Sequence, residues 1–168
     1  MSKTNLCFIG LAKNFTDIVC KQLSAQLDMF YANVQEIIEF ELLDIPSVEE
    51  KCGREYLLKE EMKIINRISC YENTLINIEY SNLNNETNLK TIKEHCLLVY
   101  LRLDSDRFEK ELIKDNLTKN QTLLQQDLFQ DRDFICKNIS DMYINCTDLK
   151  VNDLIRFIME QIIKYYVK

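Results

Sequence analysis

The chain has 168 residues, 46% of them hydrophobic, and its 21 basic and 27 acidic residues give it a net charge of −6. This length and composition predict one globular domain with a sizeable core. A negative surface repels a phosphate backbone, and the apolar runs are far shorter than the roughly 20 residues that cross a bilayer, so we expect neither a nucleic-acid partner nor a membrane span.

The first half of the chain alternates strand and helix patterns. A short apolar run predicts a buried strand over residues 4–10, and apolar residues at helical spacing follow it. The further predicted elements are a strand over 29–34 that passes into a helix and a helix over 54–69. Pro46, the only proline, is expected to break the chain between these helices.

The second half continues this alternation. Its predicted elements are a strand over 74–80, a polar loop over 82–88, a helix through Leu89 and Ile92, a strand over 96–103, a helix capped by Asp104 or Ser105, a helix near 127–138, a strand over 142–146 and a final amphipathic helix from Val151. Residues 114–126 are polar and lack a clear period. Alternating strands and helices predict a parallel sheet with helices on both faces.

The two glycines, Gly10 and Gly53, are the most informative count in the sequence. A phosphate loop needs several closely spaced glycines followed by Lys and Ser or Thr, and a dinucleotide fingerprint needs three glycines within a short stretch. Glycines at positions 10 and 53 satisfy neither pattern. The composition therefore excludes a glycine-rich phosphate cradle.

The seven cysteines and the single histidine, His95, bear on metal binding and on the cellular compartment. The cysteines are odd in number, and no two have the CxxC spacing typical of zinc sites. The apolar run LCFIGLA has no clear cleavage site for a signal peptidase and is more typical of a buried strand. We therefore expect buried thiols, no metal and a cytoplasmic protein.

Four further segments carry a resemblance to a known family. They are FYANVQEI (30–37), YLLKEEMKII (56–65), LLVYLRL (97–103) and DRDFICKNISDMYI (131–144). In this order and at this length, the chain resembles a shikimate kinase, which phosphorylates the 3-hydroxyl of shikimate with ATP and magnesium. The resemblance implies one domain over residues 1–168 with a phosphate-loop-kinase fold. That fold has three α/β/α layers, a central five-stranded parallel sheet and a lid-equivalent region at about 114–126.

The nucleotide-binding loop of this family aligns with residues 8–18. Gly10 keeps the first glycine, while Lys13 and Phe15 stand at the other two glycine positions. Thr16 stands where the family has the phosphate-binding lysine, and Asp17 where it has the magnesium-binding hydroxyl. We expect the Phe15 ring to fill the cradle. Lys13 either substitutes for the lost lysine or is an exposed lysine near a helix start, and we favour the second interpretation.

The substrate-binding positions also depart from the family pattern. Ala32 and Val34 replace the two aspartates, so no side chain remains there to orient or deprotonate an alcohol. Leu57 replaces an arginine, residues 79–81 replace a triple-glycine turn, and Gln121 is the best match to the lid arginine.

Arg132 is the one substrate-binding position that survives. It aligns with the arginine that clamps the shikimate carboxylate, and the match of Asp141 downstream supports the register. Two interpretations stay open: a residual anion site, or an arginine that only caps a helix or faces solvent. We favour the second.

Three functional hypotheses follow. The first is a non-catalytic, shikimate-kinase-like binding or regulatory module with no cofactor, a possible protein partner and a monomeric or weakly dimeric state. The second is a divergent shikimate kinase that binds Mg-ATP at a rebuilt site, which needs Lys13, Asp17, Arg54 and Arg132 to converge. The third is an enzyme or ligand binder of another class in the same cleft. The first is favoured because the phosphate cradle, the general base and most substrate-binding arginines are replaced together.

Overall fold

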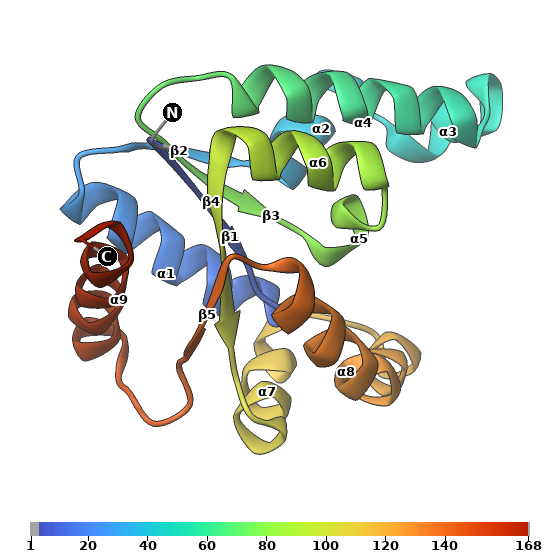
Figure 1. The fold of residues 1–168 in the computed structure, drawn as a ribbon. Helices are drawn as coiled ribbons and strands as arrows, with labels where there is room; N and C mark the ends of the chain where they lie inside the picture. Colours follow the sequence, from blue (N-terminus) through green and yellow to red (C-terminus); the bar gives the residue numbers. More distant parts are fainter. Residues whose placement is uncertain (1–3, 168) are drawn as a thin grey trace.

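The computed structural model describes residues 4–167. Its central sheet has five parallel strands in the order β2-β3-β1-β4-β5 (Figure 1). The strands are β1 (Asn5–Ile9), β2 (Phe30–Asn33), β3 (Thr74–Ile78), β4 (Cys96–Arg102) and β5 (Met142–Asn145). All four neighbouring pairs run parallel. The predicted fold class is therefore confirmed.

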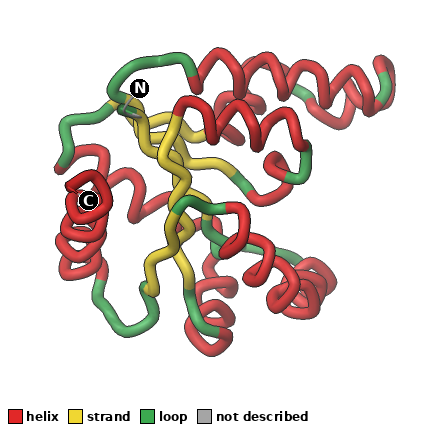
Figure 2. The backbone as a smooth tube through the Cα atoms, in the orientation of Figure 1, coloured by secondary structure: helices red, strands yellow, loops and turns green. Residues whose placement is uncertain are grey.

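Helices connect the strands and cover both faces of the sheet (Figure 2). They are α1 (Lys13–Gln26), α2 (Val34–Leu42), α3 (Ile45–Cys52), α4 (Arg54–Ser69), α5 (Tyr80–Leu83), α6 (Glu86–His95), α7 (Ser105–Leu112), the short 3-10 helix η1 (Ile113–Asp115), α8 (Lys119–Ile139) and α9 (Val151–Val167). Within residues 4–167, none of the helices has the length and apolar character needed to cross a membrane.

The core has two layers because strand side chains alternate between the two faces of the sheet. Leu6 and Phe8 of β1 pack with α1, α7 and α9 on one face, whereas Cys7 and Ile9 pack with α2, α4 and α6 on the other. Every residue of β1 and β3 is buried. Central strands covered on both faces explain the continuous apolar runs in the sequence.

The segment expected to form a polar lid is largely helical. Helix α8 begins at Lys119, well before the predicted start near residue 127. Thr118 and Gln121 form a reciprocal capping box, in which each side chain binds the other residue's backbone amide. This local start signal stabilises a helix whose first turns lack apolar periodicity.

Two smaller expectations are met in part. The chain does break near Pro46, which lies in the first turn of α3, and Asp44 caps that helix. All seven cysteines are free thiols, but Cys52 and Cys70 are exposed, contrary to the expectation that the cysteines are buried. Both lie at helix ends: Cys52 ends α3, which buries no residue, and Cys70 follows α4.

Candidate functional site

The candidate site lies at the carboxyl ends of β1 and β3, where ligands bind in open parallel sheets. Two cavities of about 220 Å³ each open there. We call them the Asp17 cavity and the Arg132 cavity after the residue that distinguishes each. Gly10, Lys13 and Glu79 line both, so the two cavities adjoin. A larger groove of about 580 Å³ lies between α1 and α9, away from these strand ends.

The structure brings the residues predicted from the sequence together at this place. Gly10, Lys13, Thr16 and Asp17 all line the Asp17 cavity. Arg132 lines the neighbouring cavity, which Gly10 and Lys13 share. Their individual contacts then decide what each residue is able to do.

Gly10 and Thr16 contact each other closely just after β1. A Cβ atom at Gly10 would lie 1.9 Å from Oγ1 of Thr16, so only glycine fits without a shift. The Thr16 hydroxyl donates a hydrogen bond of 2.8 Å to the carbonyl of Ala12 and is buried. The close packing against Thr16 therefore explains why residue 10 is a glycine. The Thr16 hydroxyl carries no positive charge, so it does not replace the phosphate-binding lysine expected at this position.

The first turn of α1 binds a carboxylate from the same chain. The backbone amides of Lys13 and Asn14 donate hydrogen bonds of 2.9 and 2.8 Å to the two carboxylate oxygens of Asp115. Burial raises the pKa of Asp115, although these two amide hydrogen bonds oppose the rise. A helix N-terminus is a ready anion site, and here the anion is Asp115.

Phe15 does not occupy either cavity. Its side chain is buried in the hydrophobic core with residues of α7 and α9, contrary to the expectation that it fills the cradle. The guanidinium carbon of Arg107 lies 6.0 Å from the centre of the Phe15 ring. An aromatic ring at the third position of α1 points inward, because that side of the helix packs on the sheet.

Asp17 is held by three donors at the carboxyl end of β2. Tyr31 donates a hydrogen bond of 2.6 Å and Asn33 one of 3.0 Å to the same oxygen, and Lys21 lies 2.7 Å from the other. Asn77 in turn donates to the Tyr31 hydroxyl at 3.0 Å. Burial alone would raise the pKa of Asp17, but the hydrogen bonds from Lys21, Tyr31 and Asn33 outweigh it and lower the pKa.

This network leaves Asp17 unsuited to catalysis. A carboxylate with a lowered pKa is a poor proton acceptor near neutral pH. The residues present also do not fit magnesium, because the oxygens of Asp17 are already bound by Lys21, Tyr31 and Asn33. In the part of the chain that the structure describes, no group of three His, Cys, Asp or Glu side chains is arranged to hold a metal ion.

Lys13 forms an ion pair with Glu79, the residue that follows β3, at 2.9 Å. Its side chain is 58% exposed. Glu79 stands at the border of both cavities and partly neutralises Lys13 there. Arg54, the other residue needed for a rebuilt site, instead pairs with Glu49 at 3.1 Å and lines neither cavity.

Arg132 lies on α8 at the wall of its cavity. Its guanidinium carbon is 5.2 Å from the centre of the Tyr80 ring, and its Nη1 donates a hydrogen bond to Gln125. Among residues 4–167, no carboxylate forms an ion pair with Arg132. Its positive charge therefore faces a cavity also lined by the polar residues Ser81 and Asn84.

Three positions that the resemblance aligns with substrate-binding residues of the family are apolar and buried. Ala32, Val34 and Leu57 are 8%, 0% and 2% exposed. Gln121, the best match to the lid arginine, is exposed, and its side chain binds the backbone of Thr118. These positions therefore offer no base and no cation to a ligand.

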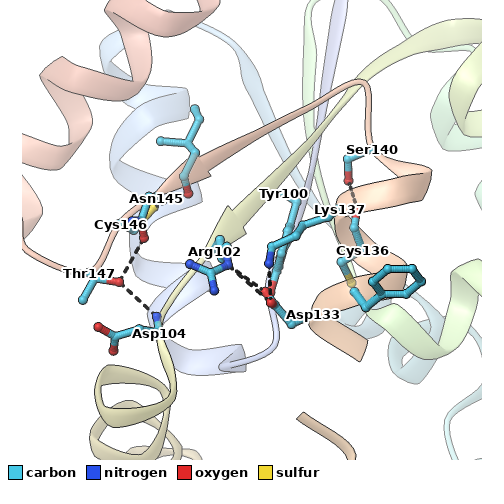
Figure 3. A network of polar contacts seen from close by, with 12 residues as sticks. Tyr100, Arg102, Asp104, Asp133, Cys136, Lys137, Ser140, Asn145, Cys146 and Thr147 are labelled. Atoms are coloured by element: carbon cyan, nitrogen blue, oxygen red, sulfur yellow. Dashed lines mark hydrogen bonds and ion pairs between the residues drawn. The ribbon is translucent and has the colours of Figure 1, made fainter. Parts of the chain in front are cut away.

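A buried carboxylate that the sequence analysis missed fixes the helix that carries Arg132. Asp133 accepts hydrogen bonds of 2.9 Å from Tyr100 and 3.0 Å from Arg102, and Lys137 lies 2.7 Å away (Figure 3). Burial alone would raise the pKa of Asp133, but these donors lower it. The i, i+4 spacing of Asp133 and Lys137 could have predicted their ion pair from the sequence. No local sequence pattern predicts the contact of Asp115 with the start of α1, which is about a hundred residues away.

Comparisons with known proteins agree with this architecture. The sequence profile of the shikimate kinase family matches residues 18–166. This match begins after the loop that contains Gly10, Thr16 and Asp17. No curated protein matches the chain.

Solved shikimate kinases share the fold. The enzyme from Acinetobacter baumannii, solved in complex with shikimate, has a TM-score of 0.83 and 18% identity, covering 99% of this chain and 97% of its own. The enzyme from Bacteroides thetaiotaomicron has a TM-score of 0.79 and 11% identity, covering 95% and 98%. That from Aquifex aeolicus has a TM-score of 0.72 and 21% identity, covering 94% and 95%. With a family profile matched over most of its length, the chain belongs to the shikimate kinase family.

Proposed function

We propose that this chain is a non-catalytic member of the shikimate kinase family, which acts as a binding or regulatory module and does not transfer phosphate from ATP. The observation that carries the proposal is the carboxylate of Asp115 on the amides of Lys13 and Asn14. A kinase of this family needs those amides, unobstructed, for the phosphates of ATP.

Electrostatics adds to this obstruction. Two unit negative charges about 4 Å apart repel by roughly 4 kcal/mol at an effective dielectric constant of about 20. A triphosphate at the start of α1 would meet Asp115 directly, while Lys13 in the same turn is paired with Glu79. The local charges therefore oppose nucleotide binding.

The acceptor side lacks the chemistry as well. Ala32 and Val34 stand where the family has its two aspartates, and neither side chain is able to accept a proton or orient an alcohol. Arg132, by contrast, has no carboxylate ion-pair partner among residues 4–167 and lines a polar cavity. We therefore expect binding without transfer, with a small carboxylate as the ligand of the Arg132 cavity.

The alternative is a divergent shikimate kinase with a rebuilt site. One observation favours it: Lys13 and Arg132 line the same cavity, as a kinase acting on an anionic alcohol would require. It needs Asp115 to leave the helix amides when Mg-ATP binds. Arg54 does not contribute, because it pairs with Glu49 outside the cavities.

A phosphoryl-transfer assay separates the two functions. The purified chain is incubated with shikimate, ATP and magnesium, and shikimate 3-phosphate and ADP are quantified, with an authentic shikimate kinase as positive control. We expect no product, and no growth on minimal medium when the chain is expressed in a strain that lacks shikimate kinase. Turnover that depends on both substrates would overturn the non-catalytic proposal.

A further inference from the structure

The segment between α7 and α8, residues 113–118, is hydrogen-bonded to the start of α1 through the side chain of Asp115. We propose that this segment is an internal latch, in which Asp115 replaces an external anion on the first turn of α1 and keeps the anion site closed. The inference rests on the proposed function, because it names what regulates the anion site of the non-catalytic protein.

The contact has the geometry of a helix cap supplied from far along the chain. Amides in the first turn of a helix have no partner within the helix. Ala12, at the N-cap position of α1, has no side-chain acceptor to offer them. Asp115, 102 residues after Lys13, satisfies two of these amides with its two oxygens. The bond pattern is that of an oxyanion on a helix N-terminus.

The residues on both sides of Asp115 are fixed by local interactions, which orient its carboxylate toward α1. Before it, the buried Glu111 accepts hydrogen bonds from Arg107 at 2.9 Å and Lys114 at 2.7 Å. After it, Asn116 has a left-handed backbone with φ of 53°, which turns the chain. Thr118 then begins α8 with its capping box. A segment ordered at both ends loses little entropy when its central carboxylate binds.

Occupation by Asp115 and by an external anion are mutually exclusive, because both use the same two amides. The apparent affinity for an external anion therefore falls in proportion to the fraction of molecules with an open latch. Removing the Asp115 carboxylate should expose the two amides and create measurable affinity for inorganic phosphate. It should not create phosphoryl transfer, since no aspartate replaces Ala32 or Val34.

The test compares the wild type with Asp115→Ala and the nearly isosteric Asp115→Asn, which keeps only one acceptor oxygen. Asp127→Asn, at an exposed position of α8, is the matched control for the change of charge. Amide hydrogen exchange is followed by NMR at Lys13, Asn14 and residues 113–118. Loss of a helix cap should accelerate exchange at these amides by roughly fivefold in Asp115→Ala, less in Asp115→Asn and not in the control.

A titration with inorganic phosphate completes the test. We expect the amide signals of Lys13 and Asn14 to shift in both Asp115 variants and to stay unchanged in the wild type and in Asp127→Asn. Unchanged exchange in the Asp115 variants overturns the latch. So does phosphate binding at these amides in the wild type, or its absence in both variants.

Failure of the latch and failure of the proposed function give different results. Phosphoryl transfer by the wild type would end the non-catalytic proposal and leave the exchange data interpretable. Conversely, an inactive wild type with an unaltered Asp115→Ala variant would end the latch and leave the non-catalytic proposal standing.

Discussion

The two adjoining cavities differ in what their charged groups contact. In the Asp17 cavity the ionic groups are engaged: Asp17 binds Lys21, Tyr31 and Asn33, and Lys13 pairs with Glu79. In the Arg132 cavity the guanidinium lies 5.2 Å from the centre of the Tyr80 ring and donates a hydrogen bond to the amide oxygen of Gln125. The ionic groups beside Asp17 thus contact one another, whereas Arg132 has no carboxylate ion-pair partner among residues 4–167.

The largest expected effect on stability comes from Asp133, whose polar network holds the helix that carries Arg132. Asp133→Asn removes the negative charge that Arg102 and Lys137 share in a buried network. Removal of one partner of such a network costs about 3 kcal/mol of unfolding free energy. Urea denaturation measures the loss. Asp131→Asn, an exposed neighbour on α8, is the control and should stay within about 0.5 kcal/mol of the wild type. Equal stability of the two variants would contradict the structural role of Asp133.

The next effect tests why Gly10 is kept beside the Asp17 cavity. Gly10→Ala places a methyl group against the Thr16 hydroxyl and should cost about 2 kcal/mol of unfolding free energy. In the Thr16→Ala background the same change should cost clearly less, because the obstructing hydroxyl is gone. A double-mutant cycle by denaturant unfolding gives the coupling. If both costs are equal, packing against Thr16 does not explain this glycine.

The polar network of Asp17 should appear in the pH dependence of stability. Its pKa is lowered in the folded state, so its stabilisation is complete above the unfolded pKa of about 3.9 and is lost as the pH falls through the folded pKa. Asp17→Asn should lose roughly 1.5 kcal/mol of unfolding free energy at pH 7 and progressively less below pH 4. Thermal unfolding at several pH values measures this.

The exposed Asp28→Asn is the control for that measurement. It should not alter the pH profile. A difference between wild type and Asp17→Asn that does not shrink in acid would mean that the carboxylate charge is not what stabilises the network.

The smallest expected effect is a change in ligand affinity at the Arg132 cavity. Shikimate, as a small carboxylate, should bind weakly to the wild type, and Arg132→Gln should weaken this binding by roughly tenfold, with little change in stability. Isothermal titration calorimetry measures both affinities. Arg156→Gln, which removes the same charge from an exposed position on α9, should bind as the wild type does. Equal binding by wild type and Arg132→Gln would remove the distinction between the two cavities.

Much of the fold followed from local patterns. The buried strands β1, β3 and β4 were recognisable as apolar runs, and the amphipathic helices α1, α4 and α9 by their period, because both depend on residues near one another in the chain. The early start of α8 was missed, since a capping box stabilises a helix whose first turns carry no apolar period. The inward direction of Phe15 was missed as well, because alignment to a loop does not say which way a side chain points.

The sequence by itself determined that a glycine-rich phosphate cradle is impossible here, since its two glycines are at positions 10 and 53. Its resemblance to the family also predicted that Ala32, Val34 and Leu57 stand at substrate-binding positions. Only the tertiary structure decided what the first amides of α1 bind: Asp115 accepts hydrogen bonds from Lys13 and Asn14 because η1 packs beside the start of α1. Such a contact joins residues about a hundred positions apart, and it forms only once the sheet has brought α1 and α7 together.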